Sequence, residues 1–231
     1  MLKQNRVVAV IWCGGKGTRM RISGPKQLIE VDGKASNELQ RTLLGRLVSQ
    51  LQKIGVGRII LGTGRNYEGI GKWLSLMKGK GLINTRIDVV GEKFFFWRPK
   101  YRNIRKFISS TENALFLYGD TIYNNYWLKK MLSKARVHSS KPFVLVPWGK
   151  QEFKGKRNYF TRIGKLGLIA NSNGIEFLEK HLRKTDRIKP WSFALKPKIL
   201  KPFYAGPFMN VNTKKELAKA GLKIKQAKWR A

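Results

Sequence analysis

The stretch VVAVIWCGGKGTRM, residues 7–20, decides the fold class. Its first five residues form a short apolar run, which is typical of a strand buried on both faces of a parallel sheet. Gly14 and Gly15 end that run, and Gly17 follows. Glycines after a strand let the backbone approach an anion closely and direct its N–H groups toward it. The stretch therefore predicts a strand followed by an anion-binding loop.

Strand-like and helix-like segments alternate along the next part of the chain. Leucines recur at helical spacing through residues 39–51, and the preceding Ser36-Asn37 is expected to cap that helix. Further helices are predicted over residues 68–77 and 126–135, and further strands over residues 58–61, 87–90, 115–118 and 143–146. This alternation predicts a three-layer α/β fold with a mostly parallel, twisted, Rossmann-like sheet.

The pattern changes after about residue 147. Two short apolar runs, residues 166–170 and 175–178, are joined by Asn171-Ser-Asn-Gly174, which indicates a β-hairpin. A further strand and a last helix are expected over residues 191–195 and 214–220. The chain shows no internal repeat, so we expect a single domain spanning residues 1–231, with the hairpin as a small elaboration.

The charge balance is the most unusual feature of the composition. The 231 residues include 48 Lys or Arg and 13 Asp or Glu, which gives a net charge of +35. Such a charge concentrates anions around the protein, so nucleotides, phosphorylated metabolites, nucleic acid and acidic polymers are all candidate partners. A lysine-rich source proteome is the alternative explanation. The bases are spread along the chain and not gathered in a tail, so a detachable nucleic-acid-binding arm is not expected.

Apolar runs and cysteine content indicate the compartment. No apolar run approaches the roughly 18–20 residues of a membrane span, so none is expected. The single cysteine, Cys13, excludes an internal disulfide and fits a reducing environment. No His lies near it in sequence, and it is interpreted as a packed core residue and not as a nucleophile. We therefore expect a cytoplasmic protein.

Three kinds of phosphate-binding loop are compatible with glycines after a strand, and spacing separates them. A P-loop requires Lys followed by Ser or Thr, whereas Lys16 is followed by Gly17. A dinucleotide-binding loop has a third glycine where Met20 stands, which disfavours that interpretation. A nucleoside triphosphate cradle fits best, because backbone N–H groups bind phosphate oxygens while Arg19 and Lys26 add positive charge.

Three motifs, in order along the chain, resemble those of the nucleotidyltransferase superfamily. Gly14-Gly-Lys-Gly-Thr-Arg-Met20 with Pro25-Lys-Gln-Leu-Ile29 is similar to its glycine-rich signature. Leu115-Phe-Leu-Tyr-Gly-Asp120 resembles the apolar strand that delivers a metal-binding aspartate, and residues 208–217 resemble a late segment with Asp or Asn. The superfamily includes sugar-1-phosphate nucleotidyltransferases, cytidylyltransferases and the molybdenum-cofactor guanylyltransferase group.

The resemblance implies a nucleotide-diphospho-sugar transferase fold, which is glycosyltransferase-A-like, and a Mg²⁺-dependent reaction. The implied enzyme transfers NMP from an NTP to a small phosphorylated acceptor, such as a sugar 1-phosphate, and releases pyrophosphate. The implied catalytic residues are Arg19, Lys26 and Asp120. The implied nucleotide-binding residues are Trp12, Cys13, Gly14, Gly15, Lys16, Gly17, Thr18, Arg19 and Lys26.

The metal site departs from the superfamily pattern. The implied ligands are Asp120, Asn210 and Asn212, and many relatives carry a second aspartate where the asparagines stand. An amide oxygen can ligate magnesium but contributes no negative charge. The resemblance also divides the chain into a nucleotide-binding core, residues 1–147, and acceptor-side elements, residues 148–231.

Two basic segments are candidates for specificity, and two other functions stay open. Residues 92–111 interleave aromatic and basic side chains, which can stack bases and bind phosphates. The resemblance implies a nucleobase pocket there, and a core-packing turn with a solvated basic face is the alternative. For the basic residues 148–162 the resemblance implies an acceptor site, and a solvated basic loop is the alternative. One alternative function is a nucleic-acid-binding protein on a degenerate transferase scaffold, suggested by the charge and the missing carboxylate. The other is a nucleotide-sugar-dependent glycosyltransferase, which shares the fold.

Overall fold

The computed structural model describes residues 6–14, 24–31, 35–91, 97–136, 143–148, 167–181, 200–204, 209–210, 218 and 224–226. The strands are β1 (Arg6–Trp12), β2 (Glu30–Val31), β3 (Arg58–Gly62), β4 (Arg86–Val90), β5 (Glu112–Tyr118), β6 (Thr121–Ile122), β7 (Val144–Trp148), β8 (Leu168–Asn171), β9 (Leu200–Tyr204), β10 (Met209–Asn210) and β11 (Ile224–Gln226). The α-helices are α1 (Leu43–Lys53), α2 (Tyr67–Gly79), α3 (Trp97–Arg105), α4 (Asn125–Ala135) and α5 (Ser172–His181), and the short 3-10 helices are η2 (Lys26–Leu28), η3 (Glu38–Arg41) and η4 (Gly64–Asn66).

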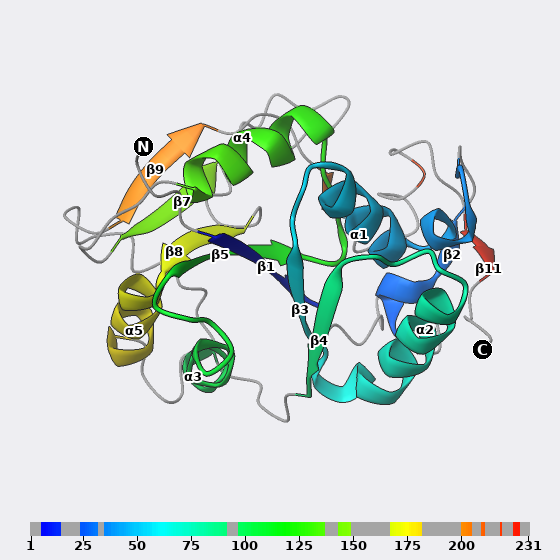
Figure 1. Ribbon diagram of the computed structural model, residues 1–231, viewed down its shortest axis with the longest axis horizontal. Coiled ribbons are helices and arrows are strands. Elements are labelled where there is room, and N and C mark those ends of the chain that lie inside the picture. The colour runs from blue at the N-terminus through cyan, green and yellow to red at the C-terminus, as the bar shows by residue number, and fades with distance from the viewer. Residues whose placement is uncertain are drawn as a thin grey trace.

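Seven of the strands form one twisted, mostly parallel sheet in the order β4-β3-β1-β5-β8-β7-β9 (Figure 1). β1 pairs in parallel with β3 on one side and with β5 on the other, and β7 pairs in parallel with β9. β8 runs antiparallel to both of its neighbours. The mostly parallel sheet expected from the sequence is confirmed, and strands from both halves of the chain join it.

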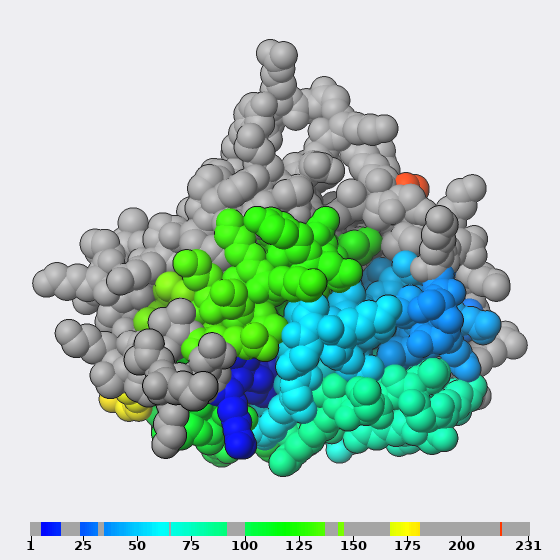
Figure 2. All heavy atoms as spheres, turned by 45° about the horizontal axis from the view of Figure 1, so that its top comes forward, coloured from blue at the N-terminus to red at the C-terminus, as the bar shows by residue number. Residues whose placement is uncertain are grey.

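Helices cover both faces of this sheet, which explains why the first strand is apolar from Val7 onward. Along β1, Ala9 and Ile11 pack in a cluster with α1, α2 and α4, whereas Val8 and Val10 pack with α3 and α5. Figure 1 shows α1 and α4 on one side of the sheet and α3 and α5 on the other, and Figure 2 shows α4, α1 and α2 adjoining on one face. The fold therefore has the three predicted layers.

The helix expected after Ser36-Asn37 is divided into two parts. The Asn37 side chain accepts a hydrogen bond from the Gln40 N–H at 3.2 Å, but it caps only the short η3. Thr42 is extended, and its hydroxyl accepts from the Gly45 N–H at 3.0 Å to cap α1. An Asx cap followed by a Thr cap thus separates a 3-10 turn from the helix that follows.

The predicted β-hairpin is wrong. β8 ends at Asn171, and the next residues form α5 instead of a second strand. The Asn171 side chain accepts a hydrogen bond from the Gly174 N–H at 2.8 Å, which begins the helix. A Cβ at Gly174 would lie 2.1 Å from the Phe143 carbonyl oxygen, so this glycine permits close packing and does not form a turn.

Two other predicted elements lie almost entirely outside the described residues. They are the strand over residues 191–195 and the helix over residues 214–220, of which only Ala218, a helical residue, is described. In the part of the chain that the structure describes, no helix combines the length and the apolar character needed to cross a membrane.

Candidate active site

Backbone hydrogen bonds join the carboxyl ends of the central parallel strands. The Cys13 N–H donates to the Gly62 carbonyl at 2.7 Å, and the Gly119 N–H donates to the Trp12 carbonyl at 3.1 Å. The Asn66 side-chain amide donates to the Cys13 carbonyl at 2.8 Å. The beginning of the glycine loop and the turn after β5 therefore lie side by side, at the sheet edge where α/β proteins bind ligands.

Lys26 and Asp120 form an ion pair at this edge. Their side chains are only 8% and 16% exposed. Lys26 begins η2, whose residues are all buried, and Pro25 before it is extended with φ near −67°. Two motifs separated by 94 positions in the sequence thus meet through opposite charges.

Asp120 is positioned by a glycine that cannot easily be replaced. A Cβ on Gly119 would lie 3.1 Å from both Cys13 Sγ and Gln27 Cγ. Behind the turn, the buried Tyr123 hydroxyl accepts a hydrogen bond from the Tyr118 N–H at 2.9 Å. Burial raises the pKa of the Tyr123 hydroxyl, which is therefore neutral at physiological pH. The turn that carries Asp120 thus packs against uncharged side chains.

The small β6–β10 ladder brings the late motif to the same place. Asn210 pairs with Thr121, the residue after Asp120, in antiparallel register. The backbone of Asn210 therefore lies beside the strand that begins immediately after Asp120, whereas Asn212 lies outside the described residues. Of the three implied metal ligands, the structure brings Asp120 and the Asn210 backbone together.

The donor chemistry here fits a hard divalent cation. Asp120 supplies a carboxylate, and the neighbouring Thr121 supplies a hydroxyl. Mg²⁺ in nucleotide sites is commonly held by one or two carboxylates, with substrate phosphates and water completing its shell. The described residues contain no group of three or more His, Cys, Asp or Glu that could hold a metal alone. These residues therefore fit a cation site in which Asp120 and the phosphate oxygens of a substrate supply the ligands.

Trp12 and Cys13 have buried side chains on opposite faces of the sheet. The Trp12 ring stacks on Phe116 at 5.9 Å between centroids and meets Tyr101 edge-on at 6.1 Å. Cys13 is fully buried, and this burial raises the pKa of its thiol, as expected for a core residue. Any contact of these two residues with a nucleotide would therefore involve the backbone. Gly14 is described, and Gly15, Lys16, Gly17, Thr18 and Arg19 lie outside the described residues.

The basic segment 92–111 contains α3, which packs against the sheet and α5. Tyr101 is buried, and Arg102 Nε contacts Glu179 Oε1 at 2.8 Å. Arg105 Nη1 contacts Glu176 Oε2 at 3.0 Å. The described part of this segment agrees with the core-packing interpretation, but carboxylates of α5 neutralise Arg102 and Arg105. Residues 92–96, and residues 149–162 of the second basic segment, lie outside the described residues.

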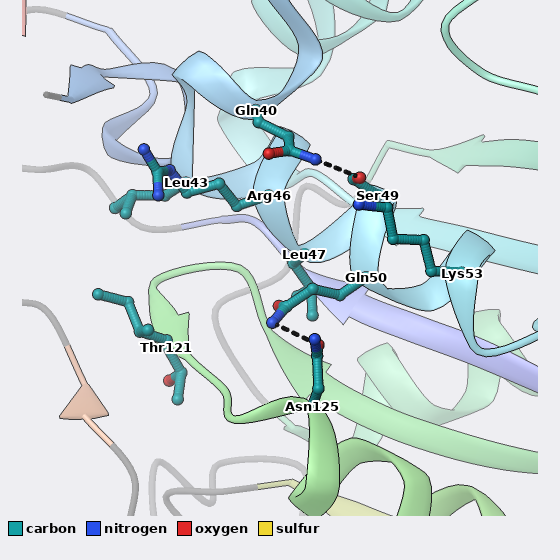
Figure 3. Close-up of a pocket in the computed structure, with 10 residues that line it drawn as sticks. Gln40, Leu43, Arg46, Leu47, Ser49, Gln50, Lys53, Thr121 and Asn125 are labelled. Atoms are coloured by element: carbon teal, nitrogen blue, oxygen red, sulfur yellow. Dashed lines mark hydrogen bonds between the residues drawn. The ribbon is translucent and has the colours of Figure 1, made fainter. Parts of the chain in front are cut away.

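A pocket of about 240 Å³ lies between α1, η3 and the segment from β6 to the start of α4 (Figure 3). It was not expected from the sequence. Arg46 and Lys53 of α1 line it together with Thr121, which follows Asp120. Leucine spacing predicted the helix that carries these residues, but their position beside a distant turn required the tertiary structure.

Comparison with known proteins agrees with this geometry. In α/β folds of this kind, ligands bind outside the carboxyl ends of the strands, which is where Gly14, the buried Lys26 and Asp120 lie. Residues 9–185 match the family of the MobA-like NTP transferase domain, and the chain belongs to that family. It is a nucleotidyltransferase. The search of curated proteins gives no match.

Solved structures with the same fold cover nearly the whole chain. The inositol-1-phosphate CTP transferase of T. maritima is 17% identical with a TM-score of 0.64, and the match covers 93% of each chain. A Bacillus anthracis protein assigned as a glucose-1-phosphate thymidylyltransferase is 15% identical with a TM-score of 0.65, again over 93% of each chain. HddC from Yersinia pseudotuberculosis is 20% identical with a TM-score of 0.61, over 92% of this chain and 97% of the other. At these identities the likeness shows the fold.

Proposed function

We propose that the protein transfers NMP from an NTP to a small phosphorylated acceptor, such as a sugar 1-phosphate, with Mg²⁺ as cofactor. The buried Lys26–Asp120 pair beside the first residues of the glycine loop is the observation that carries the proposal. A buried charge without a partner is costly, which explains why Lys26 and Asp120 pair with each other. Charged side chains at a ligand-binding edge of the sheet favour charged substrates. Family membership supports nucleotidyl transfer, and the acceptor class is our inference.

The proposed reaction is an in-line displacement at phosphorus. An oxygen of the acceptor phosphate forms a bond to the α-phosphorus of the NTP, and the bond from that phosphorus to the pyrophosphate oxygen breaks. Mg²⁺, when bound, would neutralise charge on the phosphate oxygens. Asp120 would hold the ion, together with Asn210 and Asn212, and Lys26 and Arg19 would bind the phosphates. Residues 12–18 would supply backbone contacts to the nucleotide.

The division into a nucleotide-binding core, residues 1–147, and an acceptor side, residues 148–231, stays a prediction, as does the cytoplasmic location. On this division, β10 would contribute the acceptor-side half of the site, because it pairs with β6 directly after Asp120. The net charge of +35 also suits anionic substrates, and nucleic acid stays an untested partner.

Pyrophosphate release tests the proposal. Each of the four NTPs is incubated with Mg²⁺ and a panel of sugar phosphates, and acceptor-dependent pyrophosphate is measured. We expect Asp120→Asn and Lys26→Met to lower the rate about 100-fold or more, because each removes a group that stabilises developing charge. Lys80→Met is the matched control, since this exposed lysine pairs with Glu38 away from the proposed site.

The same assay separates the alternatives. A glycosyltransferase would consume a nucleotide sugar and release a nucleoside diphosphate instead of pyrophosphate. A nucleic-acid-binding protein would bind RNA or DNA with a steep salt dependence and show no acceptor-dependent turnover. Pyrophosphate release that is indifferent to both the acceptor and Asp120→Asn would contradict the proposed function.

A further inference from the structure

The pocket between α1 and β6 adjoins the Lys26–Asp120 pair. Thr121 lines the pocket and directly follows Asp120 in the chain. On the other side, α1 packs against η2, which begins with Lys26. The volume of about 240 Å³ is below the roughly 300–1,000 Å³ of pockets for drug-sized ligands, so its ligand would be small.

Arg46 is the distinctive group in this pocket. Its Nε and Nη2 atoms are buried and have no hydrogen-bond partner among the described residues. Burial lowers the pKa of the guanidinium, which nevertheless stays charged at neutral pH. No Asp or Glu is among the described residues that line the pocket. A positive group with unsatisfied donors, and with no counter-charge among the described lining residues, is unfavourable by itself, and an anion would satisfy it.

The remaining lining is polar and held in place by hydrogen bonds. The Gln50 amide donates to Asn125 Oδ1 at 2.9 Å and to the Tyr123 carbonyl at 3.0 Å. In Figure 3 this Gln50–Asn125 bond crosses between α1 and the start of α4, and Arg46 extends away from it. Lys53 lies two turns after Arg46 on the same helix and adds a second positive charge. Positive charge next to fixed amides and a hydroxyl suits a phosphate attached to a polyol.

We propose that this pocket binds a small polyhydroxylated phosphate, with the Arg46 guanidinium contacting the phosphate oxygens. Identifying this ligand with the acceptor rests on the proposed function, because an acceptor must lie next to Asp120 and Lys26. The binding site itself rests on Arg46, on the absence of acids from the described lining and on the position of Thr121. Arg46 is thus a specificity-determining residue for the acceptor phosphate.

Direct titration tests the site without requiring turnover. Glucose 1-phosphate, inorganic phosphate and neutral glucose are titrated calorimetrically into the full chain, with and without a non-hydrolysable NTP analogue. We expect glucose 1-phosphate to bind more tightly than glucose, and Arg46→Gln to weaken its binding about 10- to 100-fold. Arg46→Lys should retain part of the affinity, because the charge stays and the fork geometry is lost. Arg86→Gln, an exposed arginine on β4, is the matched control.

Folding and turnover readouts make the outcomes distinct. Arg46→Gln should keep the melting temperature of the parent or raise it, because it removes unsatisfied buried donors. In the pyrophosphate assay it should raise the KM for the acceptor and leave the KM for the NTP unchanged. The inference would be overturned if glucose 1-phosphate bound equally well to the parent and to Arg46→Gln, or bound to neither protein. It would also be overturned if Arg46→Gln raised the KM for the NTP and the KM for the acceptor equally. Arg46-dependent binding without any transfer would support the site and count against the proposed function.

Discussion

The ion pair between Lys26 and Asp120 should be strongly coupled in folding. Each side chain is largely buried, so removing one partner takes away the adjacent opposite charge from a group that water reaches poorly. Lys26→Met leaves the Asp120 carboxylate, and Asp120→Asn leaves the Lys26 ammonium. The double variant leaves neither charge. The sum of the two single effects should therefore exceed the effect of the double variant.

The magnitude follows from the burial of the pair. Breaking a buried pair by removing one partner costs about 3–5 kcal/mol, a large part of the roughly 5–15 kcal/mol by which domains are stable. For a chain of this length that corresponds to a fall in melting temperature of about 6–20 °C. The exposed pair between Lys80 and Glu38, whose side chains are 44% and 36% exposed, should couple by only about 0–1 kcal/mol.

Urea unfolding of the parent, both single variants and the double variant measures this coupling, and the Lys80–Glu38 cycle serves as control. The midpoint should change while the slope with denaturant stays constant, since the surface exposed on unfolding is the same. Single variants as stable as the parent would refute the reasoning. So would a Lys26–Asp120 coupling no larger than that of the exposed pair, because burial would then not set the strength of the interaction.

Three further outcomes are expected from the structure. Gly119→Ala should lower the free energy of unfolding by about 1–3 kcal/mol, because the added Cβ would lie 3.1 Å from two side chains. Gly71→Ala in α2 has open space around the added Cβ and should raise the free energy of unfolding by about 0.5–1 kcal/mol. Urea midpoints of the two variants that shift in the same direction would contradict this. Because burial raises the pKa of Cys13, an aromatic disulfide reagent should react with it only in unfolded protein, and rapid colour release from the native protein would be incompatible. A hydrogen bond and charge from Lys180, followed by the charge of Arg105, lower the pKa of Glu176 in the folded state, so its stabilisation is present at neutral pH and is lost as the pH falls below about 4.3. Thermal melts of Glu176→Gln and the parent should therefore differ at neutral pH and converge near about pH 2, and a constant difference would argue against the pairing.

The local sequence pattern was sufficient to predict the central strands and the position of Asp120 at the edge of the sheet. The apolar run of β1 reflects burial on both faces, and its side chains alternate between two packed clusters. The apolar β5 ends in Gly119-Asp120, so the aspartate had to emerge at the carboxyl edge of a parallel sheet. Both features depend on neighbours along the chain, which a sequence shows directly.

The hairpin prediction failed because the residues expected to form its turn make other contacts in the folded protein. Asn171 and Gly174 are typical turn residues, and the short apolar run after them is compatible with a strand or a helix. In the structure Asn171 caps α5, and Gly174 allows the Phe143 carbonyl to approach. Likewise, Arg102 and Arg105 of α3 fitted an anion-binding surface by sequence, but in the structure they pair with Glu179 and Glu176 of α5. Their pairing partners lie about seventy residues further along the chain, beyond the reach of periodicity.

The sequence by itself determined the α/β class, the order of the central elements and the motifs that define a nucleotidyltransferase, because strand periodicity, glycine placement and short motifs are properties of consecutive residues. Only the tertiary structure decided that Lys26 meets Asp120, that β10 pairs beside Asp120, and that Arg46 faces a pocket without an acid among its described lining residues. These relations join segments that the chain brings together only when helices and strands pack on a common sheet. Charge pairing and unsatisfied donors depend on that packing, since the same side chains in water would be hydrated and independent of one another.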